Sequence, residues 1–377
     1  MLNRRRILAA TGSAILGLGV AACSRGTAGT SATNAAGDLG TEAAGMRTFD
    51  AEWGPHQRTF MSWPTEAIWG EDIDDVRDDI AGIARAIADY EEVVMMASPG
   101  DEDEAEYQCG RKVTVETIPV DDLWARDTVP VFVSEGGEVR GVDLNFNGWG
   151  NKQEHGNDGK VGETLLADFE IPRIAAKLVA EGGSLETDGE GTLFLTESSV
   201  FNDNRNPGRS RDDLEAELKQ LLGVKKVIWF KGVYGKDITD AHVDSLVRFV
   251  APGVVLLDTP GPGVPPDVWS ASTEQARTVL SESTDAAGRS FEIIELQQPD
   301  PEKIRGTEEE FLSSYVNFYI ANDAVFLPQF GDRKADKNAQ RILGEVFPDR
   351  DIVPLNIDVV ASGGGGIHCA THDMPKL

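Results

Sequence analysis

Residues 315–357, YVNFYIANDAVFLPQFGDRKADKNAQRILGEVFPDRDIVPLNI, hold one complete copy of the pattern that decides the fold. Tyr315–Ala321 and Ala324–Leu327 are short apolar runs of the kind that forms buried strands. Asp336–Phe347 has apolar residues at steps of three and four, which predicts an amphipathic helix, and Asp351–Ile357 predicts another strand. The stretch is therefore expected to fold as a strand, strand, helix, strand unit.

The same order of elements recurs upstream. Strand pairs are expected at Val129–Val133 with Val139–Leu144 and at Val243–Val250 with Gly253–Asp258, and helices at Asp72–Tyr90, Lys160–Phe169, 210–223 and Thr273–Ser283. About five ββαβ units at a spacing of roughly sixty residues predict an α/β fold with a closed repeat architecture rather than a doubly wound sheet. No glycine-rich phosphate fingerprint follows an expected strand, which argues against a nucleotide-binding fold.

The first 45 residues predict export and a tether. Arg4, Arg5 and Arg6 precede an apolar run that is typical of a twin-arginine signal. The run is too short and too rich in glycine for a membrane-spanning helix. The run ends in Val-Ala-Ala-Cys23, which resembles a lipobox and implies lipidation of Cys23; a signal peptide with a chance cysteine is the alternative. We expect a signal peptide at residues 1–22, a flexible tether at 23–45 and one folded domain at 46–377, anchored to the outer face of a bacterial cytoplasmic membrane.

The charge and the cysteines limit the possible partners. The 64 acidic and 35 basic residues give a net charge of −29, which disfavours nucleic acid and favours a small cationic ligand, although acidity that serves only solubility is an alternative. Apart from Cys23, only Cys109 and Cys369 are present, too few for a disulfide scaffold. We expect Cys109 to be structural and not bonded to Cys369.

A candidate nucleophile and a candidate base lie far apart in the chain. Gly363–Gly366 allow a close approach of the backbone to a ligand and lead into Cys369, although a buried cysteine without a role is the alternative. His242 and Asp244 are two residues apart on an expected strand, so both side chains are predicted to point to one face. A histidine satisfied within the sheet is the other interpretation.

Two further carboxylates suggest the class of substrate. Asp127 follows Trp124 and Arg126, and Glu181 precedes two glycines; an ion pair with Arg126 and a simple turn are the alternatives. Carboxylates bind a guanidinium through charge-assisted hydrogen bonds, whereas a peptide hydrolase needs donors for its oxyanion. A thiol, an imidazole and three carboxylates therefore favour guanidine chemistry over a cysteine peptidase.

Several ordered motifs carry a family resemblance: Trp53–His56, Ser62–Pro64, Trp124–Pro130, Asn145–Gly150, Glu181–Ser184 with Asp188-Gly189, Asn204–Pro207, His242–Asp244 and Gly363–Thr371. Over residues 50–377 the sequence resembles the agmatine deiminase and bacterial peptidylarginine deiminase family of the guanidine-modifying, or pentein, superfamily. The resemblance implies a five-bladed α/β propeller with a central site, and neither a metal nor an organic cofactor. The sequence departs from the agmatine deiminase pattern at Val129 and Ala241, where the family has glycine, at Gly366, where it has asparagine, and at His372-Asp373, where it has two glutamines.

The resemblance also implies roles for individual residues. Cys369 matches the nucleophile, His242 the general acid and base, Asp127, Glu181 and Asp244 the carboxylates around the guanidinium, Trp124 an aromatic wall, and Gly364 and Gly365 a thin backbone beside the substrate. The implied reaction is hydrolysis of agmatine to N-carbamoylputrescine and ammonia through a covalent amidino-cysteine, as in polyamine and putrescine biosynthesis. Peptidyl or free arginine is the alternative substrate, and a lipid-anchored protein that binds polyamines or guanidines without turnover is the alternative of another class.

Overall fold

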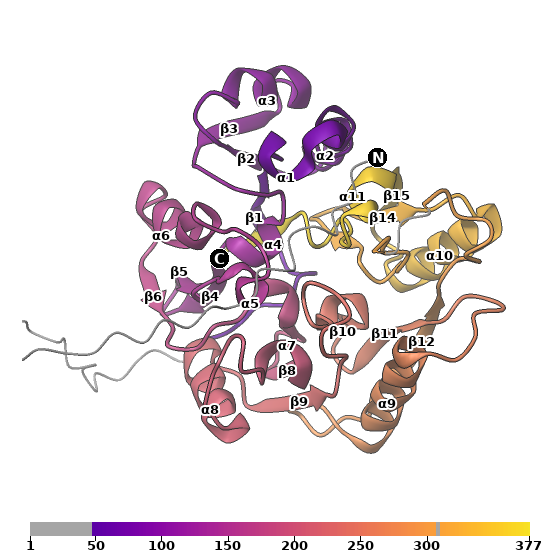
Figure 1. Ribbon diagram of the computed structural model, residues 1–377. Helices are drawn as coiled ribbons and strands as arrows, with labels where there is room; N and C mark the ends of the chain where they lie inside the picture. Colours follow the sequence, from indigo (N-terminus) through magenta and orange to yellow (C-terminus); the bar gives the residue numbers. More distant parts are fainter. Residues whose placement is uncertain (1–46, 307–309) are drawn as a thin grey trace, which may run out of the picture. The chain divides into compact units, whose positions relative to one another are not determined.

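Five small sheets form the core of the protein, and a computed structural model describes them over residues 47–306 and 310–377. The predicted signal peptide and tether lie outside the described residues. Four sheets have three strands and lie side by side around a common centre (Figure 1). Their strands are β4 Val131–Glu135, β5 Glu138–Asp143, β6 Arg173–Ala175, β7 Glu186–Thr187, β8 Thr192–Thr196, β9 Lys226–Phe230, β10 Val247–Ala251, β11 Val254–Thr259, β12 Glu292–Gln297, β13 Tyr319–Ile320, β14 Ala324–Gln329 and β15 Asp351–Asn356.

Each of these four sheets is a ββαβ unit. The first two strands pair antiparallel, and the third strand joins the second in parallel. A parallel pair needs a crossover connection, and the crossover helices are α6 Asp158–Asp168, α8 Arg211–Leu222, α9 Val268–Glu282 and α10 Arg333–Val346. The predicted repeat is confirmed.

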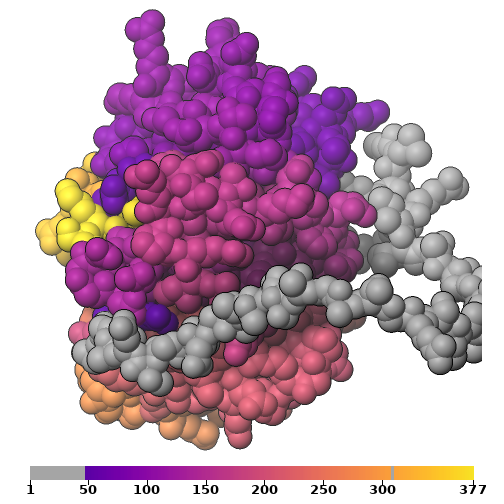
Figure 2. All heavy atoms as spheres, turned by 90° about the vertical axis from the view of Figure 1, so that its left-hand side faces the viewer, coloured from indigo at the N-terminus to yellow at the C-terminus, as the bar shows by residue number. Residues whose placement is uncertain are grey.

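The remaining sheet joins both ends of the described chain. It has the order β16-β1-β2-β3, with β16 at His372–Pro375, β1 at His56–Ser62, β2 at Val93–Ala97 and β3 at Val113–Thr117, and it carries α2 Ile73–Ile87 and α3 Glu102–Cys109. The C-terminal strand β16 pairs antiparallel with β1 and closes the ring of sheets. Residues near the C-terminus, yellow in Figure 2, accordingly reach the surface beside the indigo and magenta parts of the chain. Cys369 therefore lies three residues before a strand that is held in place by its pairing with β1.

Local sequence explains the long helices. In α2 the predicted apolar stripe is buried, with Val76, Ile80 and Ile87 fully inaccessible. The hydroxyl of Ser210 accepts a hydrogen bond from the Asp213 N–H at 3.1 Å and caps α8, which ends at Gly223 as predicted. The short helices are α1 Glu66–Trp69, α4 Ala125–Thr128, α5 Gly148–Asn151, α7 Glu197–Val200 and α11 Asp358–Ser362, and the 3₁₀ turns are η2 Gly70–Asp72, η3 Gly182–Ser184 and η4 Val243–Ser245. No helix within the described ranges is long and apolar enough to cross a membrane.

Two predicted strands are shorter than expected. Strand β10 begins at Val247, because Val243–Ser245 forms a 3₁₀ turn. Only Tyr319–Ile320 of the run Tyr315–Ala321 pairs as a strand. Both runs are apolar because they are buried, and burial alone does not distinguish a strand from an irregular buried segment.

The buried carboxyl group of Asp258 predicts a pH-dependent stability. Burial raises its pKa to about 8 against the hydrogen bonds from Ser314 and Gln298, whereas an unfolded aspartate titrates near 3.9. Between these values the folded state binds more protons than the unfolded state, so stability falls as the pH rises. Asp258→Asn should raise the free energy of unfolding by about 4 kcal/mol more at pH 7.5 than at pH 4. Urea unfolding at both pH values checks this; an equal effect at both would contradict it.

Candidate active site

The predicted site residues lie on short helices, turns and loops between the strands, and they meet in the interior. Asp127 lies on α4, Glu181 precedes η3, His242 and Asp244 flank the start of η4, and Cys369 precedes β16. All five side chains are buried, with Cys369 the most accessible at 9%. Their charges therefore interact in a site largely shielded from bulk water.

The position of Gly183 shows how closely these groups converge. A Cβ atom added there would lie 2.7 Å from Nδ1 of His242, 2.9 Å from Oδ1 of Asp127 and 3.0 Å from Oδ2 of Asp244. Any side chain at residue 183 would therefore collide with three site groups at once. The glycine is required for the approach of η3 to the other elements.

The imidazole of His242 lies between two carboxylates. Its Nε2 is 3.3 Å from Oε2 of Glu181, and its Nδ1 is 3.8 Å from Oδ1 of Asp127. Burial alone would lower the pKa of His242, but the negative charges of Asp127 and Glu181 raise it to about 9. At neutral pH the ring is therefore protonated and can donate a proton.

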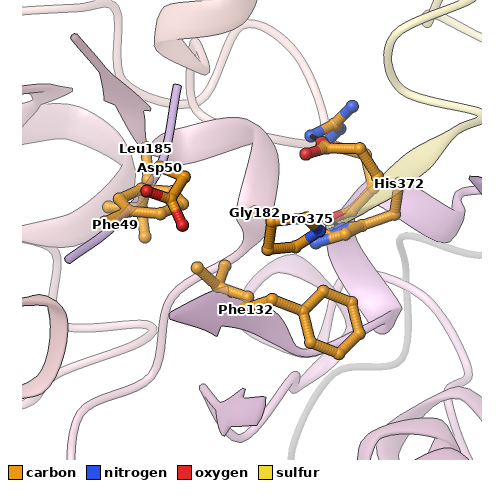
Figure 3. A pocket seen from close by; sticks show the side chains of 10 residues that line it. Phe49, Asp50, Phe132, Gly182, Leu185, His372 and Pro375 are labelled. Carbon is orange, nitrogen blue, oxygen red and sulfur yellow. Dashed lines mark hydrogen bonds and ion pairs between the residues drawn. The ribbon is translucent and has the colours of Figure 1, made fainter. Parts of the chain in front are cut away.

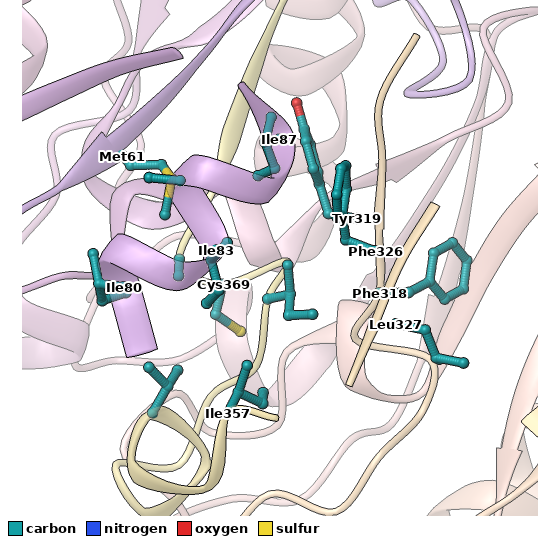
Figure 4. Close-up of a cluster of buried hydrophobic side chains, with 14 of the residues drawn as sticks. Met61, Ile80, Ile83, Ile87, Phe318, Tyr319, Phe326, Leu327, Ile357 and Cys369 are labelled. Carbon is teal, nitrogen blue, oxygen red and sulfur yellow. The ribbon is translucent and has the colours of Figure 1, made fainter. Parts of the chain in front are cut away.

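Cys369 belongs to a buried hydrophobic cluster that includes Met61 and Ile83 (Figure 4). Its Sγ is 3.6 Å from Oδ2 of Asp244 and accepts a hydrogen bond from Nδ2 of Asn317 at 3.2 Å. Burial and the negative charges of Asp244 and Asp127 hold the pKa of the thiol well above its usual range. A cation bound beside these carboxylates would favour the thiolate.

Each of the three carboxylates is held by a donor outside the cluster. Asp127 Oδ2 accepts from Nε1 of Trp149 at 2.8 Å, Glu181 Oε1 from Nε of Arg205 at 2.9 Å, and Asp244 Oδ2 from Nδ1 of His368 at 2.8 Å. Burial raises the pKa of Asp127. For Glu181, Arg205 outweighs the effect of burial and lowers the pKa. For Asp244, His368 outweighs it and lowers the pKa to about 2. The cluster is therefore oriented before any ligand arrives.

Two sequence interpretations need correction. Arg126 does not serve as the ion partner of Asp127; it pairs with Glu52 at 3.0 Å and Asp373 at 3.1 Å. His242 and Asp244 do share the site, but the predicted reason, alternation along a strand, is wrong. They lie at the start of a 3₁₀ turn.

The glycine-rich loop packs on Trp124. A Cβ atom at Gly365 would lie 2.2 Å from Cζ3 of the indole, and Gly364 has a φ of 89°, so both positions require glycine. Ala241, which precedes His242, has a φ of 65°, a left-handed conformation that favours glycine. The alanine keeps that backbone conformation at a cost of about 1 kcal/mol.

Four residues of the site were not predicted individually. Trp149 and Arg205 fall within motifs that carry the resemblance, and His368 adjoins the nucleophile candidate, but the sequence does not show which atoms they contact. Asn317 lies in a run that reads only as a buried strand. No local signal identifies it, because its contact with Cys369 spans 52 residues.

A small cavity lies beside the site and is not a suitable place for the substrate. It measures about 30 Å³ and is lined by residues that include Phe132, Gly182 and His372 (Figure 3), together with Arg126. This volume holds a water molecule but not a guanidino compound.

Both cysteines of the described chain, Cys109 and Cys369, are free, as predicted, and both are buried. Among residues 47–306 and 310–377, no group of three or more His, Cys, Asp or Glu side chains could hold a metal ion.

The sequence profile of the Porphyromonas-type peptidyl-arginine deiminase family matches residues 48–375. The chain belongs to this deiminase family. It is 38% identical to the agmatine deiminase of Medicago truncatula, over 87% of this chain and 96% of that protein, and 36% identical to the agmatine deiminase of Stutzerimonas stutzeri, over 86% and 94%. The solved structure of the agmatine deiminase of Enterococcus faecalis superposes with a TM-score of 0.81 at 30% identity, covering 88% of this chain and 96% of that one.

These similarities confirm the predicted family and the α/β propeller of the pentein type. Because the similarity to the deiminase family extends over the whole described region, it includes all five sheets and every element that supplies a site residue. The site described above is therefore part of the shared fold.

Proposed function

We propose that this protein is a hydrolase that converts agmatine and water to N-carbamoylputrescine and ammonia. The observation that carries the proposal is the convergence of a thiol, a protonated imidazole and carboxylates around Gly183. Carboxylates supply the charge that a guanidinium needs, and the thiol supplies a nucleophile. The similarity to agmatine deiminases supports the same chemistry.

The first half of the reaction forms a covalent intermediate. Asp127, Glu181 and Asp244 receive the guanidinium, whose positive charge favours the thiolate of Cys369, and the thiol proton is released to water. The sulfur attacks the central carbon and forms a C–S bond. His242 then donates its proton to the departing nitrogen as the C–N bond breaks, which releases ammonia and leaves an amidino-cysteine.

The second half regenerates the enzyme. His242, now neutral, accepts a proton from water as the oxygen attacks the amidino carbon. The C–S bond then breaks, the electron pair returns to Cys369, and the sulfur takes the remaining hydroxyl proton as the ureido product leaves. Trp124 and the backbone at Gly364 and Gly365 are proposed to border the substrate.

The charges around the site favour agmatine over free arginine. The α-carboxylate of arginine would need a cation, and the nearby buried arginines already have partners. Arg205 pairs with Glu181 and Asp240, and Arg248 pairs with Glu52 and Glu186. An amine-ended substrate needs no such cation.

A comparison of substrates tests the proposal. The full chain is mixed with agmatine, arginine and an arginyl peptide, and ammonia release and the product mass are measured. We expect rapid release from agmatine, with the mass change for replacement of an imino group by oxygen. Faster turnover of the peptide would identify a peptidylarginine deiminase. Binding of agmatine without ammonia release would instead identify a protein that binds polyamines or guanidines.

We also propose that the enzyme is exported and lipid-anchored at Cys23 to the outer face of the bacterial cytoplasmic membrane. The support is the arginine triplet at residues 4–6 and the Val-Ala-Ala-Cys sequence that ends at Cys23. Metabolic labelling with a fatty acid followed by membrane fractionation tests this. Cys23→Ser should lose both the label and the membrane association, and an unlabelled native chain would exclude the anchor.

A further inference from the structure

Three buried side chains, Glu52, His368 and Asp244, lie in a row that ends in the site. The ring of His368 is 1% exposed and lies between two carboxylates. Its Nδ1 is 2.8 Å from Oδ2 of Asp244, and its Nε2 is 2.8 Å from Oε2 of Glu52. Both carboxylates are therefore within hydrogen-bond distance of the same ring.

The far end of this chain is firmly anchored. Oε2 of Glu52 accepts from Nη2 of Arg126 at 3.0 Å, and its Oε1 accepts from Nη2 of Arg248 at 2.9 Å and from the N–H of Ile320 at 2.9 Å. Although burial acts to raise the pKa of Glu52, Arg248, His368 and Arg126 lower it well below its usual value. An ionised Glu52 with fixed partners leaves the ring of His368 one orientation.

The near end of the chain is shared with the nucleophile. Oδ2 of Asp244, which accepts from His368, is also the atom 3.6 Å from Sγ of Cys369. A thiolate and a carboxylate at this separation repel each other unless a donor or a cation compensates the charge. In the structure Nδ1 of His368 donates to this oxygen, and Nδ2 of Asn317 donates to the sulfur.

We infer that His368 is a positioning residue for the reaction, which holds Oδ2 of Asp244 beside Cys369 in the orientation that a guanidinium requires. The inference rests on the proposed function, in which Asp244 binds the substrate. His368 is not expected to touch the substrate, because both of its ring nitrogens are occupied by Asp244 and Glu52. Its effect on catalysis passes through Asp244.

If His368 had a purely structural role, its contact with Glu52 would matter and its contact with Asp244 would not. The ring also ties the loop before Cys369 to Glu52, and that link alone could stabilise the fold. The two roles use different nitrogens. A donor kept at Nδ1 preserves the contact with Asp244, whereas a donor kept at Nε2 preserves the contact with Glu52.

Two matched variants separate the roles. The side-chain amide of His368→Asn can place a donor near the Nδ1 position, and that of His368→Gln near the Nε2 position. We expect His368→Gln to lower kcat/KM for agmatine on the order of 100-fold, mainly through a higher KM, since the guanidinium would meet a displaced Asp244. His368→Asn should lower it by no more than about 10-fold. Melting temperatures of both variants are measured alongside.

The ranking of the two variants decides the inference. Equal losses of kcat/KM in the two variants would overturn the inference. A more active His368→Gln would also overturn it, because a role that depends on the contact with Glu52 predicts that the glutamine variant keeps more activity. Failure of the proposed function gives a different result, namely no ammonia release from agmatine by the unmutated protein.

If neither variant folds, the unmutated ring provides the test. Histidine labelled with ¹⁵N is introduced into the full chain carrying Cys369→Ser, and agmatine is added to saturation. The Nδ1–H signal of His368 should shift as the guanidinium reaches Asp244, while the ring of His56, which is held by Glu91, should shift less. An unchanged His368 signal would overturn the inference.

Discussion

Replacement of Cys369 by serine is expected to lower kcat for agmatine by about 10⁴-fold or more while agmatine still binds. The serine hydroxyl is similar in size, but it loses its proton far less readily than a thiol, even beside a bound cation. The carboxylates of Asp127, Glu181 and Asp244 remain to hold the guanidinium. Ammonia release measures kcat, and calorimetry measures binding.

Cys109 provides the matched control. It is buried at the end of α3, away from the site groups in sequence, and burial raises the pKa of its thiol to about 12. Cys109→Ser should keep kcat unchanged and lower only the stability, because it places a hydroxyl in an apolar environment. Ammonia release by Cys369→Ser within a factor of about 100 of the native rate would exclude the covalent mechanism.

The repeated ββαβ unit was predictable because its signal is local. Apolar periodicity in residues 315–357 predicts three of the elements of one unit closely, and α10 and β15 differ from the prediction only at their ends. Strand β16 was not predicted. His372–Pro375 is short and contains an aspartate and a proline, and it becomes a strand because it pairs with β1 at the other end of the described chain. No local pattern contains that pairing.

In the site, too, some features were predictable from the sequence and others depend on contacts between distant segments. The types of group, a thiol, an imidazole and carboxylates, were identified from chemistry and from the family resemblance. Their orientation depends on contacts between distant segments, such as Asn317 with Cys369 and Arg205 with Glu181. The sequence placed Arg126 beside Asp127, yet folding directs the guanidinium to Glu52. Adjacency in sequence is therefore a poor guide to which buried charges pair.

Replacement of His242 by asparagine is expected to lower kcat by about 10³-fold. The imidazole is proposed to donate a proton to ammonia and to accept one from water, and asparagine can do neither at a useful rate. Steady-state ammonia release and a single-turnover assay for the amidino-cysteine measure both steps. A variant that keeps more than about a tenth of the native kcat would remove His242 from the mechanism.

The same substitution should also change how stability depends on pH. Asp127 and Glu181 raise the pKa of folded His242 to about 9, against burial, whereas an unfolded histidine titrates near 6.5. The stabilisation by the protonated ring is therefore complete below pH 6.5 and is lost as the pH rises through 9, over a range of about 3 kcal/mol. His242→Asn should be less stable than the native protein at pH 6, and the two should converge by pH 10. A stability difference that does not change with pH would show that folding does not raise the pKa of His242. The ring would then be mostly neutral above pH 7, and the proton for the departing ammonia would have to come from another group.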